Sequence, residues 1–289
     1  MKTRIISAAV MITIVAAVLF TGYRYNLHIV ITVFISLLAA AATYEILHHI
    51  VKIGSGFRKA VACAYAVAAF FSVSDVFHGA YDILRKETKI NEQGVSISIS
   101  MLLLSTILYI LLFTVSIIGE KREFDIKEIL ALLGAPLMYS AGFAALDCII
   151  TRPVGIYYLL LVLNFSSVCD TGAYFTGVFL GKHKLCEHVS PKKTVEGAVG
   201  GVALSLIVTA VLVYAFSAKT NIFVMLGVTV IMCIVGMLGD LFASIIKRSV
   251  GVKDYSNLIP GHGGILDRFD SMLFISPAIL SLMLFGIVA

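Results

Sequence analysis

A segment near the C-terminus concentrates acidic, basic and glycine residues in a chain that is otherwise strongly apolar. Asp240, Ser244 and Lys247 are spaced four and three residues apart, which places them on one face of a helix. Asp267, Asp270 and Ser271 are expected to share a face in the same way, at the start of the last apolar run. Carboxylates from two neighbouring helices could then hold Mg²⁺, which prefers a few protein oxygens together with substrate phosphates.

The residues between these two helices favour phosphate binding. Pro260-Gly-His-Gly-Gly264 has too many glycines for a helix and no apolar alternation for a strand. Its glycines let the backbone approach a phosphate closely, and His262 could donate to an oxygen, although we do not assign it as a general base. The alternative is a salt-bridged loop that only joins two helices. Such a loop does not need four carboxylates, four cations and three closely spaced glycines together.

A second cluster opens the seventh apolar run. In Ser190-Pro-Lys-Lys-Thr-Val-Glu-Gly, either Ser190 or Thr194 is a suitable helix cap. Lys192 and Lys193 would stand beside the unpaired N–H groups of the helix start and form a corner for phosphate. The alternative is a basic anchor at the membrane surface.

A third candidate is Asp170, in Asp170-Thr-Gly-Ala-Tyr174, where a carboxylate interrupts an apolar helix. An ionisable group at membrane depth is costly and usually faces a cavity or a partner, so we expect a cation ligand or a substrate-positioning residue. The alternative is that Asp170 marks the end of a helix and pairs with a nearby lysine.

These clusters must be positioned by membrane helices. Apolar residues make up 60% of the 289 residues, charged residues make up 13%, and the mean hydropathy is +1.00. A spanning helix needs about 20 mostly apolar residues. We therefore expect an all-α polytopic membrane protein with about nine transmembrane helices, near Ile5–Phe20, Leu27–Ile46, Ala60–Phe77, Val95–Ile118, Ile129–Ile150, Gly155–Tyr174, Ala198–Phe216, Ile222–Ile246 and Ser271–Val288.

Two boundaries and one processing signal are open at this stage. The break at Tyr23–Asn26 is either a turn or a kink, and the apolar stretch after Asp170 could continue the sixth span. The first run, preceded by Lys2 and Arg4, also resembles a secretory signal peptide. We favour a retained helix, because no soluble domain follows it.

Loop charges predict the orientation. Of the 22 Lys and Arg residues, 16 fall at the N-terminus and in the loops after even-numbered spans. The positive-inside rule then predicts a cytoplasmic N-terminus, an external C-terminus and both polar segments on the cytoplasmic side. The same rule explains the net charge of +5, so no nucleic-acid partner is expected. The five scattered cysteines indicate neither zinc nor a disulfide framework.

We expect residues 1–289 to form a single integral membrane domain. Residues 1–125 would supply support helices, with a lipid or dimer surface as a further role, and residues 126–289 would carry the catalytic loops.

The C-terminal 120 residues or so resemble the bacterial integral-membrane phosphatidate cytidylyltransferases, also called CDP-diacylglycerol synthases. The family signature is filled at each place by Ser244, Lys247-Arg248, Lys253-Asp254, Ser256, His262-Gly-Gly264, Asp267-Arg268 and Asp270. Ser190-Pro-Lys-Lys-Thr194 with Glu196-Gly197, and Asp170 with Gly172-Ala-Tyr174, are similar to the family's upstream motifs.

The sequence departs from the family pattern at three places. Members commonly have Trp at the position of Val195 and Glu at that of Ala243, and the stretch after Gly177 lacks a frequent Arg. These differences concern local packing and substrate affinity, whereas every charged residue of the long signature is present.

The resemblance implies a multi-pass enzyme of the cell (inner) membrane that makes CDP-diacylglycerol and pyrophosphate from CTP and phosphatidic acid. It implies Mg²⁺ with a neighbouring monovalent cation such as K⁺, and a homodimer. Asp240 and Asp267 would be the main metal ligands, with Asp270 and Asp170 as weaker candidates. Catalytic roles fall to Asp240, Asp267, Lys193 and Arg268, and substrate binding to Ser190, Lys192, Thr194, Ser244, Lys247, Arg248, Lys253, His262, Gly263 and Gly264.

Two other classes remain. A CDP-alcohol phosphotransferase also uses acidic metal ligands on membrane helices, but its Asp-Gly-x-x-Ala-Arg helix is missing from the sequence. A transporter would explain Asp170 and Asp240 but would not need two cationic loops on one side, and it would more often show broken helices in repeated halves.

Overall fold

The computed structural model describes residues 2–85, 92–117, 126–152, 154–216, 218 and 220–288. Two compact units divide the chain: Met1–Thr151 with Asp254–Arg268, and Arg152–Lys253 with Phe269–Ala289. The signature segment is shared between them, since Asp240 belongs to the second unit and Asp267 to the first. The division into support helices up to residue 125 and a catalytic part from residue 126 stays a prediction. Residue 125 itself lies outside the described residues.

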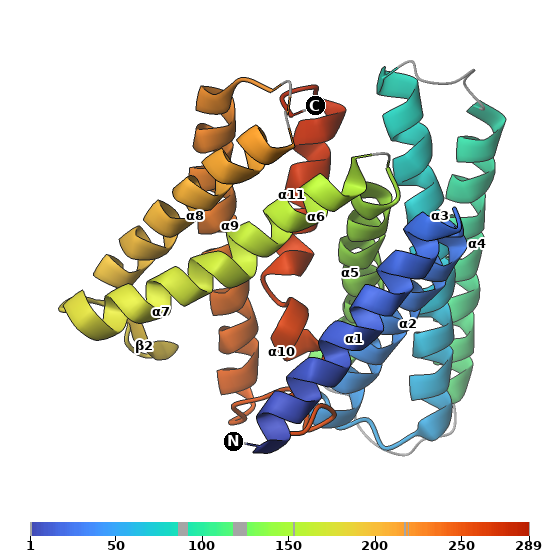
Figure 1. Ribbon diagram of the computed structural model, residues 1–289. Coiled ribbons are helices and arrows are strands. Elements are labelled where there is room, and N and C mark those ends of the chain that lie inside the picture. Colours follow the sequence, from blue (N-terminus) through green and yellow to red (C-terminus); the bar gives the residue numbers. More distant parts are fainter. Residues whose placement is uncertain are drawn as a thin grey trace. The chain divides into compact units, whose positions relative to one another are not determined.

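The first unit is a set of long apolar helices (Figure 1). Helix α3 packs against α2, α4 and α5, and α1 packs against α2. Stacked Tyr65 and Tyr109 rings, 4.4 Å apart, join α3 to α4, and Ser140 of α5 donates to the Ala66 carbonyl of α3 at 2.7 Å. The helices are α1 (Lys2–Arg24), α2 (His28–Glu45), the π-helical turn η1 (Ile46–Ile50), α3 (Gly56–Arg85), α4 (Glu92–Ile117), α5 (Ile126–Ile150) and the short α10 (Leu266–Phe269).

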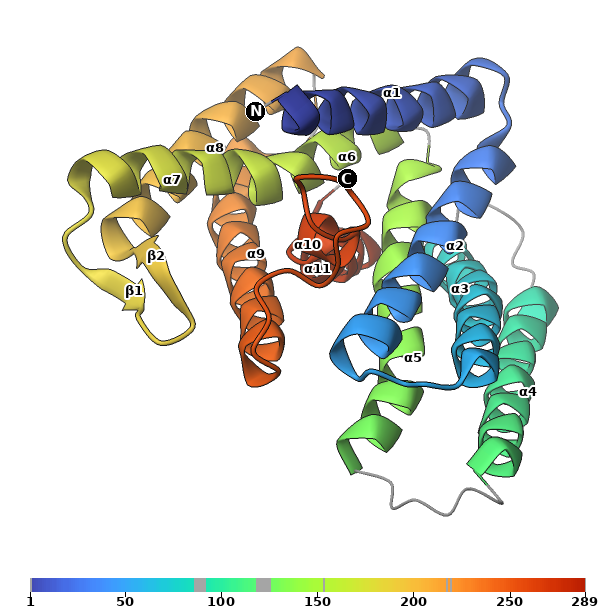
Figure 2. The same cartoon turned by 90° about the horizontal axis from the view of Figure 1, so that it is seen from below.

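The second unit contains a pair of closely packed helices and a small hairpin. Figure 2 shows α7 lying along α8, with strands β1 and β2 beside their ends. Helix α9 packs against both α8 and α11. The elements are α6 (Gly155–Leu163), the π-helical turn η2 (Asn164–Val168), α7 (Cys169–Leu180), β1 (Lys184–Cys186), β2 (Ser190–Thr194), α8 (Val195–Ala215), α9 (Ile222–Ser249) and α11 (Met272–Leu284).

Most of the predicted spans are confirmed as helices. Among the described residues, eight helices are long and apolar enough to cross a membrane, and each overlaps a predicted span. The ninth predicted span, Ser271–Val288, forms the shorter helix α11, Met272–Leu284. The sixth continues to Leu180, and the predicted end of the fourth, Ile118, lies outside the described residues.

The open boundary at Tyr23–Asn26 is a turn. Helix α1 ends at Arg24, α2 begins at His28, and Asn26 adopts a φ of 54°, in the left-handed region. Asn tolerates this conformation better than most residues, so the chain can reverse there without a glycine.

One helical expectation is wrong. Asp267 and Asp270 do not share a face of one continuous helix, because α10 ends at Phe269 and α11 begins at Met272. The Asp270 carboxylate accepts the Ser271 backbone N–H at 2.7 Å. Short acidic side chains that bind nearby backbone groups compete with helix hydrogen bonds, which explains the interruption.

The hairpin was not predicted either. Strands β1 and β2 pair antiparallel, with Lys184 opposite Thr194 and Cys186 opposite Ser190. The fold is therefore all-α apart from this two-stranded addition in the described part of the chain.

Candidate functional site

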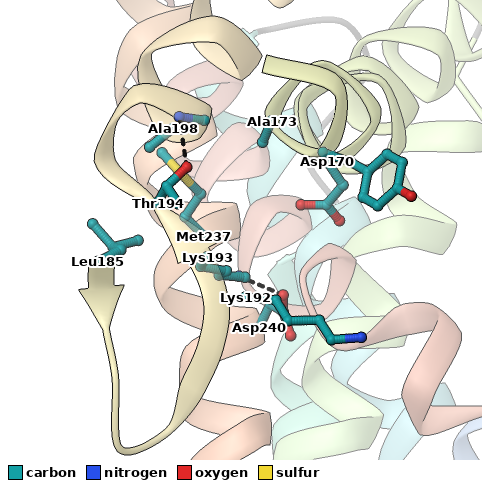
Figure 3. Close-up of a pocket in the computed structure, with 11 residues that line it drawn as sticks. Asp170, Ala173, Leu185, Lys192, Lys193, Thr194, Ala198, Met237 and Asp240 are labelled. Carbon is teal, nitrogen blue, oxygen red and sulfur yellow. Dashed lines mark hydrogen bonds and ion pairs between the residues drawn. The ribbon is translucent and has the colours of Figure 1, made fainter. Parts of the chain in front are cut away.

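A cavity of about 240 Å³ lies in the second unit, lined by residues of α7, the β1–β2 hairpin, α8 and α9. Lys193 of β2 forms an ion pair with Asp240 of α9, with Nζ 2.5 Å from Oδ2 (Figure 3). Asp170 of α7 also lines the cavity, and Figure 3 shows its carboxylate directed toward the space where that pair meets. The structure thus brings together residues from all three predicted clusters.

Thr194 fixes where the hairpin ends and α8 begins. Its backbone is extended, with φ −124° and ψ 155°, and its Oγ1 accepts the Gly197 N–H at 3.1 Å. This is N-cap geometry, which satisfies one of the unpaired donors of the helix start. Thr194 is therefore the cap, and Ser190, the alternative, lies in β2.

Glu196, in the first turn of α8, holds the chain that enters the hairpin. Its carboxylate accepts the backbone N–H groups of Lys182 at 3.0 Å and of His183 at 3.2 Å. The His183 ring also lies 2.5 Å away, from Nδ1 to Oε1. These contacts join both ends of the hairpin to α8, which fixes the strand that carries Lys192 and Lys193.

Small residues allow α7 and α8 to approach closely. A Cβ atom added at Gly201 would come 2.5 Å from the Cys169 carbonyl oxygen, and one at Gly197 would come 2.7 Å from the Ala173 carbonyl oxygen. Both oxygens belong to the backbone of α7, which cannot move aside cheaply. Small residues at such positions are how membrane helices pack closely. This packing brings Asp170 on α7 beside the residues that follow β2.

The cavity has a donor set that fits Mg²⁺ together with a phosphate ligand. Mg²⁺ in phosphate-handling sites is usually held by one or two carboxylates, waters and substrate oxygens. Asp170 and Asp240 supply two carboxylates, and Lys193 supplies a cation beside them. Among the described residues, no group of three or more His, Cys, Asp and Glu side chains could hold a metal alone. The two carboxylates and the lysine at this cavity are the groups that suit a metal bound together with an anionic substrate.

Asp170 does not mark a helix end. It is the second residue of α7, but α6, η2 and α7 run on without a break from Gly155 to Leu180. The alternative in which Asp170 closes a helix is therefore wrong.

The end of α9 carries further charges. Lys247 is buried, Arg248 and Lys253 are exposed, and Arg248 donates to the Val252 carbonyl at 3.2 Å. Ser244 Oγ lies 3.5 Å from Asp240 Oδ1, at the limit of a hydrogen bond.

Asp270 belongs to the same unit and interacts electrostatically with the α9 residues. Burial raises the pKa of its carboxyl to about 6, and the Asp240 charge adds to the rise. Hydrogen bonds from Ser271 and the charge of Lys247 oppose it. Asp270 therefore lies within electrostatic range of both Asp240 and Lys247.

The remaining predicted residues lie in the first unit, where they form a compact loop. Asp267 Oδ2 accepts the backbone N–H groups of Tyr255 at 2.8 Å and of Gly264 at 2.9 Å. Gly261 and Gly263 have φ values of +78° and +81°, which favour glycine. These contacts fold residues 255–267 back on themselves.

His262 lies between the two glycines with positive φ, and Arg268 follows Asp267 in α10. The His262 N–H donates to the Ile259 carbonyl at 2.9 Å, and its Nδ1 atom is buried with no hydrogen-bond partner among the described residues. Arg268 is exposed. The joint metal role predicted for Asp240 and Asp267, which belong to different units, stays a prediction.

Sequence reasoning missed Glu45 of α2. This residue is 2% exposed and accepts three hydrogen bonds from the loop that contains Asp267. The signal was an acidic residue inside an apolar run, which is costly at membrane depth unless it has partners. The same argument had singled out Asp170.

Comparison with known proteins agrees with the motifs. The model of the cytidylyltransferase family matches residues 2–285. Curated relatives include the phosphatidate cytidylyltransferases of Staphylococcus aureus (strain COL), 46% identical over 134 residues, and of Staphylococcus haemolyticus (strain JCSC1435), 47% identical over 134 residues. Each match covers 46% of this chain and 52% of the relative, so the chain spans about half the length of the curated relatives it matches.

Proposed function

Because the chain belongs to the cytidylyltransferase family, we propose that it transfers the cytidylyl group of CTP to phosphatidic acid, giving CDP-diacylglycerol and pyrophosphate. The observation that carries this proposal is the Lys193–Asp240 pair in a cavity that Asp170 and Lys192 also line. Cations and carboxylates at one cavity suit a polyphosphate that binds with a metal.

In the proposed reaction, an oxygen of the lipid phosphate attacks the α-phosphorus of CTP. The bond from that phosphorus to the bridging oxygen breaks, and pyrophosphate leaves with the electron pair. The nucleophile is already an anion, so no strong general base is needed. The protein must instead hold two anions together and neutralise charge on the leaving group.

The residues of the second unit are suited to holding the nucleotide. Lys192 and Lys193 stand next to the start of α8, and the positive end of a helix dipole favours an anion. Thr194 caps that helix start through its bond to the Gly197 N–H. Lys193 would neutralise triphosphate charge, while Ser190, Ser244, Lys247, Arg248 and Lys253 share the remaining contacts to the triphosphate and the lipid headgroup.

The acidic residues are proposed to hold Mg²⁺, with Asp240 and Asp267 as main ligands and Asp270 and Asp170 as weaker ones. When bound, Mg²⁺ supplies positive charge to the phosphate oxygens. A monovalent cation such as K⁺ would lie nearby. Arg268, His262, Gly263 and Gly264 are proposed to contact phosphate oxygens from the loop of the first unit.

An apolar groove next to the cavity supports a lipid substrate. It encloses about 430 Å³ between α8 and α9 and is lined by side chains such as Val202, Leu206 and Ile234. Ala198 and Met237 line both this groove and the polar cavity. A phosphate at the polar end and an acyl chain along the groove would match the two ends of phosphatidic acid.

Location and assembly follow the sequence argument. We propose a multi-pass protein of the cell (inner) membrane, with a cytoplasmic N-terminus, an external C-terminus and the site facing the cytoplasm, because most Lys and Arg residues fall in alternate loops. A homodimer is proposed from the family resemblance alone.

The test is pyrophosphate release by purified protein in detergent. Release should need CTP, phosphatidic acid and Mg²⁺ together, and Asp240→Asn and Asp267→Asn should each remove most of it without unfolding the protein. Asp75→Asn is the matched control, because Asp75 is an exposed carboxylate of α3 that does not line the cavity. Normal turnover of Asp267→Asn at saturating Mg²⁺ would contradict its metal role. No release from folded wild-type protein would favour a transporter or a binding role instead.

A further inference from the structure

Glu45 is a buried carboxylate that the proposed reaction does not use. It is the last residue of α2, it is 2% exposed, and the π-helical turn η1 follows it directly. Single π-helical turns inside longer helices often occur at functional sites. A buried carboxylate is stable only when partners satisfy it, so its partners indicate its role.

The three hydrogen-bond partners of Glu45 in the described part of the chain come from one loop far away in sequence. Oε1 accepts the Ser256 hydroxyl at 2.6 Å and the Ile265 N–H at 2.8 Å, and Oε2 accepts the Leu266 N–H at 2.9 Å. One side chain of α2 therefore fixes both ends of residues 256–266.

The backbone of this loop passes between two carboxylates. A Cβ atom at Gly264 would lie 2.5 Å from Glu45 Oε2, and one at Gly263 would lie 2.8 Å from Asp267 Oδ2. Asp267 in turn accepts the N–H groups of Tyr255 and Gly264. Glu45 bonds Ser256, Ile265 and Leu266, which are the immediate neighbours of Tyr255, Gly264 and Asp267.

We propose that Glu45 is a positioning residue that sets the Asp267 carboxylate and the adjacent Arg268 for the reaction. This rests on the proposed function for its catalytic consequence but not for its structural one. The N–H groups of Ile265 and Leu266 are held immediately before Asp267, so losing their acceptor would let the start of α10 turn. The Asp267 carboxylate would then leave the orientation that its bonds to Tyr255 and Gly264 define.

The diagnostic change is Glu45→Gln. The amide keeps the size of the side chain, but its NH₂ group cannot accept the N–H that one carboxylate oxygen now accepts. Changes to groups that orient a metal ligand typically cost about 10–100-fold in metal affinity or activity. We expect kcat to fall by about that factor and the Mg²⁺ concentration for half-maximal rate to rise.

Two further variants separate positioning from general packing. Glu45→Asp keeps the charge on a shorter side chain and should recover part of the lost kcat. Thr43→Val removes a buried hydroxyl of α2 whose one hydrogen-bond partner among the described residues is the Ala39 carbonyl, at 2.9 Å, and it should leave the Mg²⁺ dependence unchanged. If Glu45→Gln does not fold, Glu45→Asp takes its place. We then expect an intermediate loss of kcat in a protein whose unfolding temperature equals that of Thr43→Val.

Amide hydrogen exchange makes the test independent of activity. In Glu45→Gln, the amides of Ile265 and Leu266 should exchange faster than in wild type and Thr43→Val. The Gly264 amide, which donates to Asp267, should exchange faster as well. Unchanged exchange at these amides with unchanged kcat and Mg²⁺ dependence would overturn the proposal. If wild-type protein releases no pyrophosphate, the proposed function fails, whereas the exchange result still decides whether Glu45 holds this loop. Faster exchange with normal kinetics would overturn the proposal that Glu45 positions Asp267 for the reaction.

Discussion

Gly264 N–H donates to Asp267 at 2.9 Å, while the Cα of the same glycine faces the Glu45 carboxylate so closely that a Cβ atom would lie 2.5 Å from it. One glycine thus contacts two acidic residues from opposite ends of the sequence. The long C-terminal signature loop is therefore built partly on α2, a helix that the motif does not include.

Replacing Gly264 should disturb both contacts. In Gly264→Ala the new methyl group must displace the Glu45 carboxylate, which three hydrogen bonds hold in place. Overpacking of this kind typically costs about 1–3 kcal/mol. We expect a lower unfolding temperature in detergent and a clear loss of pyrophosphate release.

A double-mutant cycle identifies the cause of that loss. Glu45→Asp shortens the side chain and makes room for the methyl group, so its combination with Gly264→Ala should be less harmful than the sum of the single changes. Gly227→Ala in α9 is the matched control, because its Cβ would enter open space. Strictly additive effects would show that the methyl group acts elsewhere.

The Lys193–Asp240 pair gives a second prediction. Both side chains are only 24% exposed and Lys193 Nζ is buried, so removing one partner leaves the other charge poorly solvated and should lower stability as well as activity. Lys193→Met should lower kcat/KM for CTP by about 100-fold, the usual cost of losing one group that stabilises developing charge. Lys184→Met, a change at an exposed lysine of β1 that does not line the cavity, should have little effect. Equal effects of the two changes would contradict a specific role for Lys193.

A third prediction concerns the cap of α8. Thr194→Val removes the oxygen that accepts the Gly197 N–H but keeps the branched shape. Loss of a cap typically costs about 1 kcal/mol. Thr194→Ser retains the oxygen and should be nearer to wild type in thermal unfolding. A Thr194→Ser protein as unstable as Thr194→Val would show that packing against Gly177 and Gly181 matters more than the cap.

Helices and motifs could be predicted from sequence for a simple physical reason. In a membrane every backbone group must be paired within the chain, so each long apolar run becomes a helix, and eight of the predicted spans appear as such. The Lys193–Asp240 contact was not predicted; the two residues were only assigned roles in the same reaction. The contact depends on the hairpin, whose sequence shows no apolar alternation that would predict a strand. It also depends on the close helix packing at Gly197 and Gly201.

Two features escaped prediction, the first because it depends on contacts distant in sequence and the second because it depends on a local side-chain contact. The role of Glu45 depends on its hydrogen bonds to Ser256, Ile265 and Leu266. The local sequence pattern of α2 does not predict those partners. The break at Asp270 depends on a side chain that captures the next backbone N–H, which helix periodicity does not register. For each feature, the one signal in the sequence was an acidic residue within a stretch that is expected to be buried.

The last prediction tests whether close packing of α7 and α8 shapes the cavity. In Gly201→Ala the new methyl group would meet the Cys169 carbonyl oxygen at 2.5 Å, and this backbone atom cannot rotate away. The helices must separate, so we expect a loss of about 1–3 kcal/mol in unfolding free energy. A raised KM for CTP should accompany it, because Asp170 and Lys193 come from the two segments that this packing joins. Gly134→Ala in α5, where a Cβ would meet nothing within 4 Å, is the control. Unchanged stability and KM in Gly201→Ala would show that α7 and α8 can adjust without moving the site.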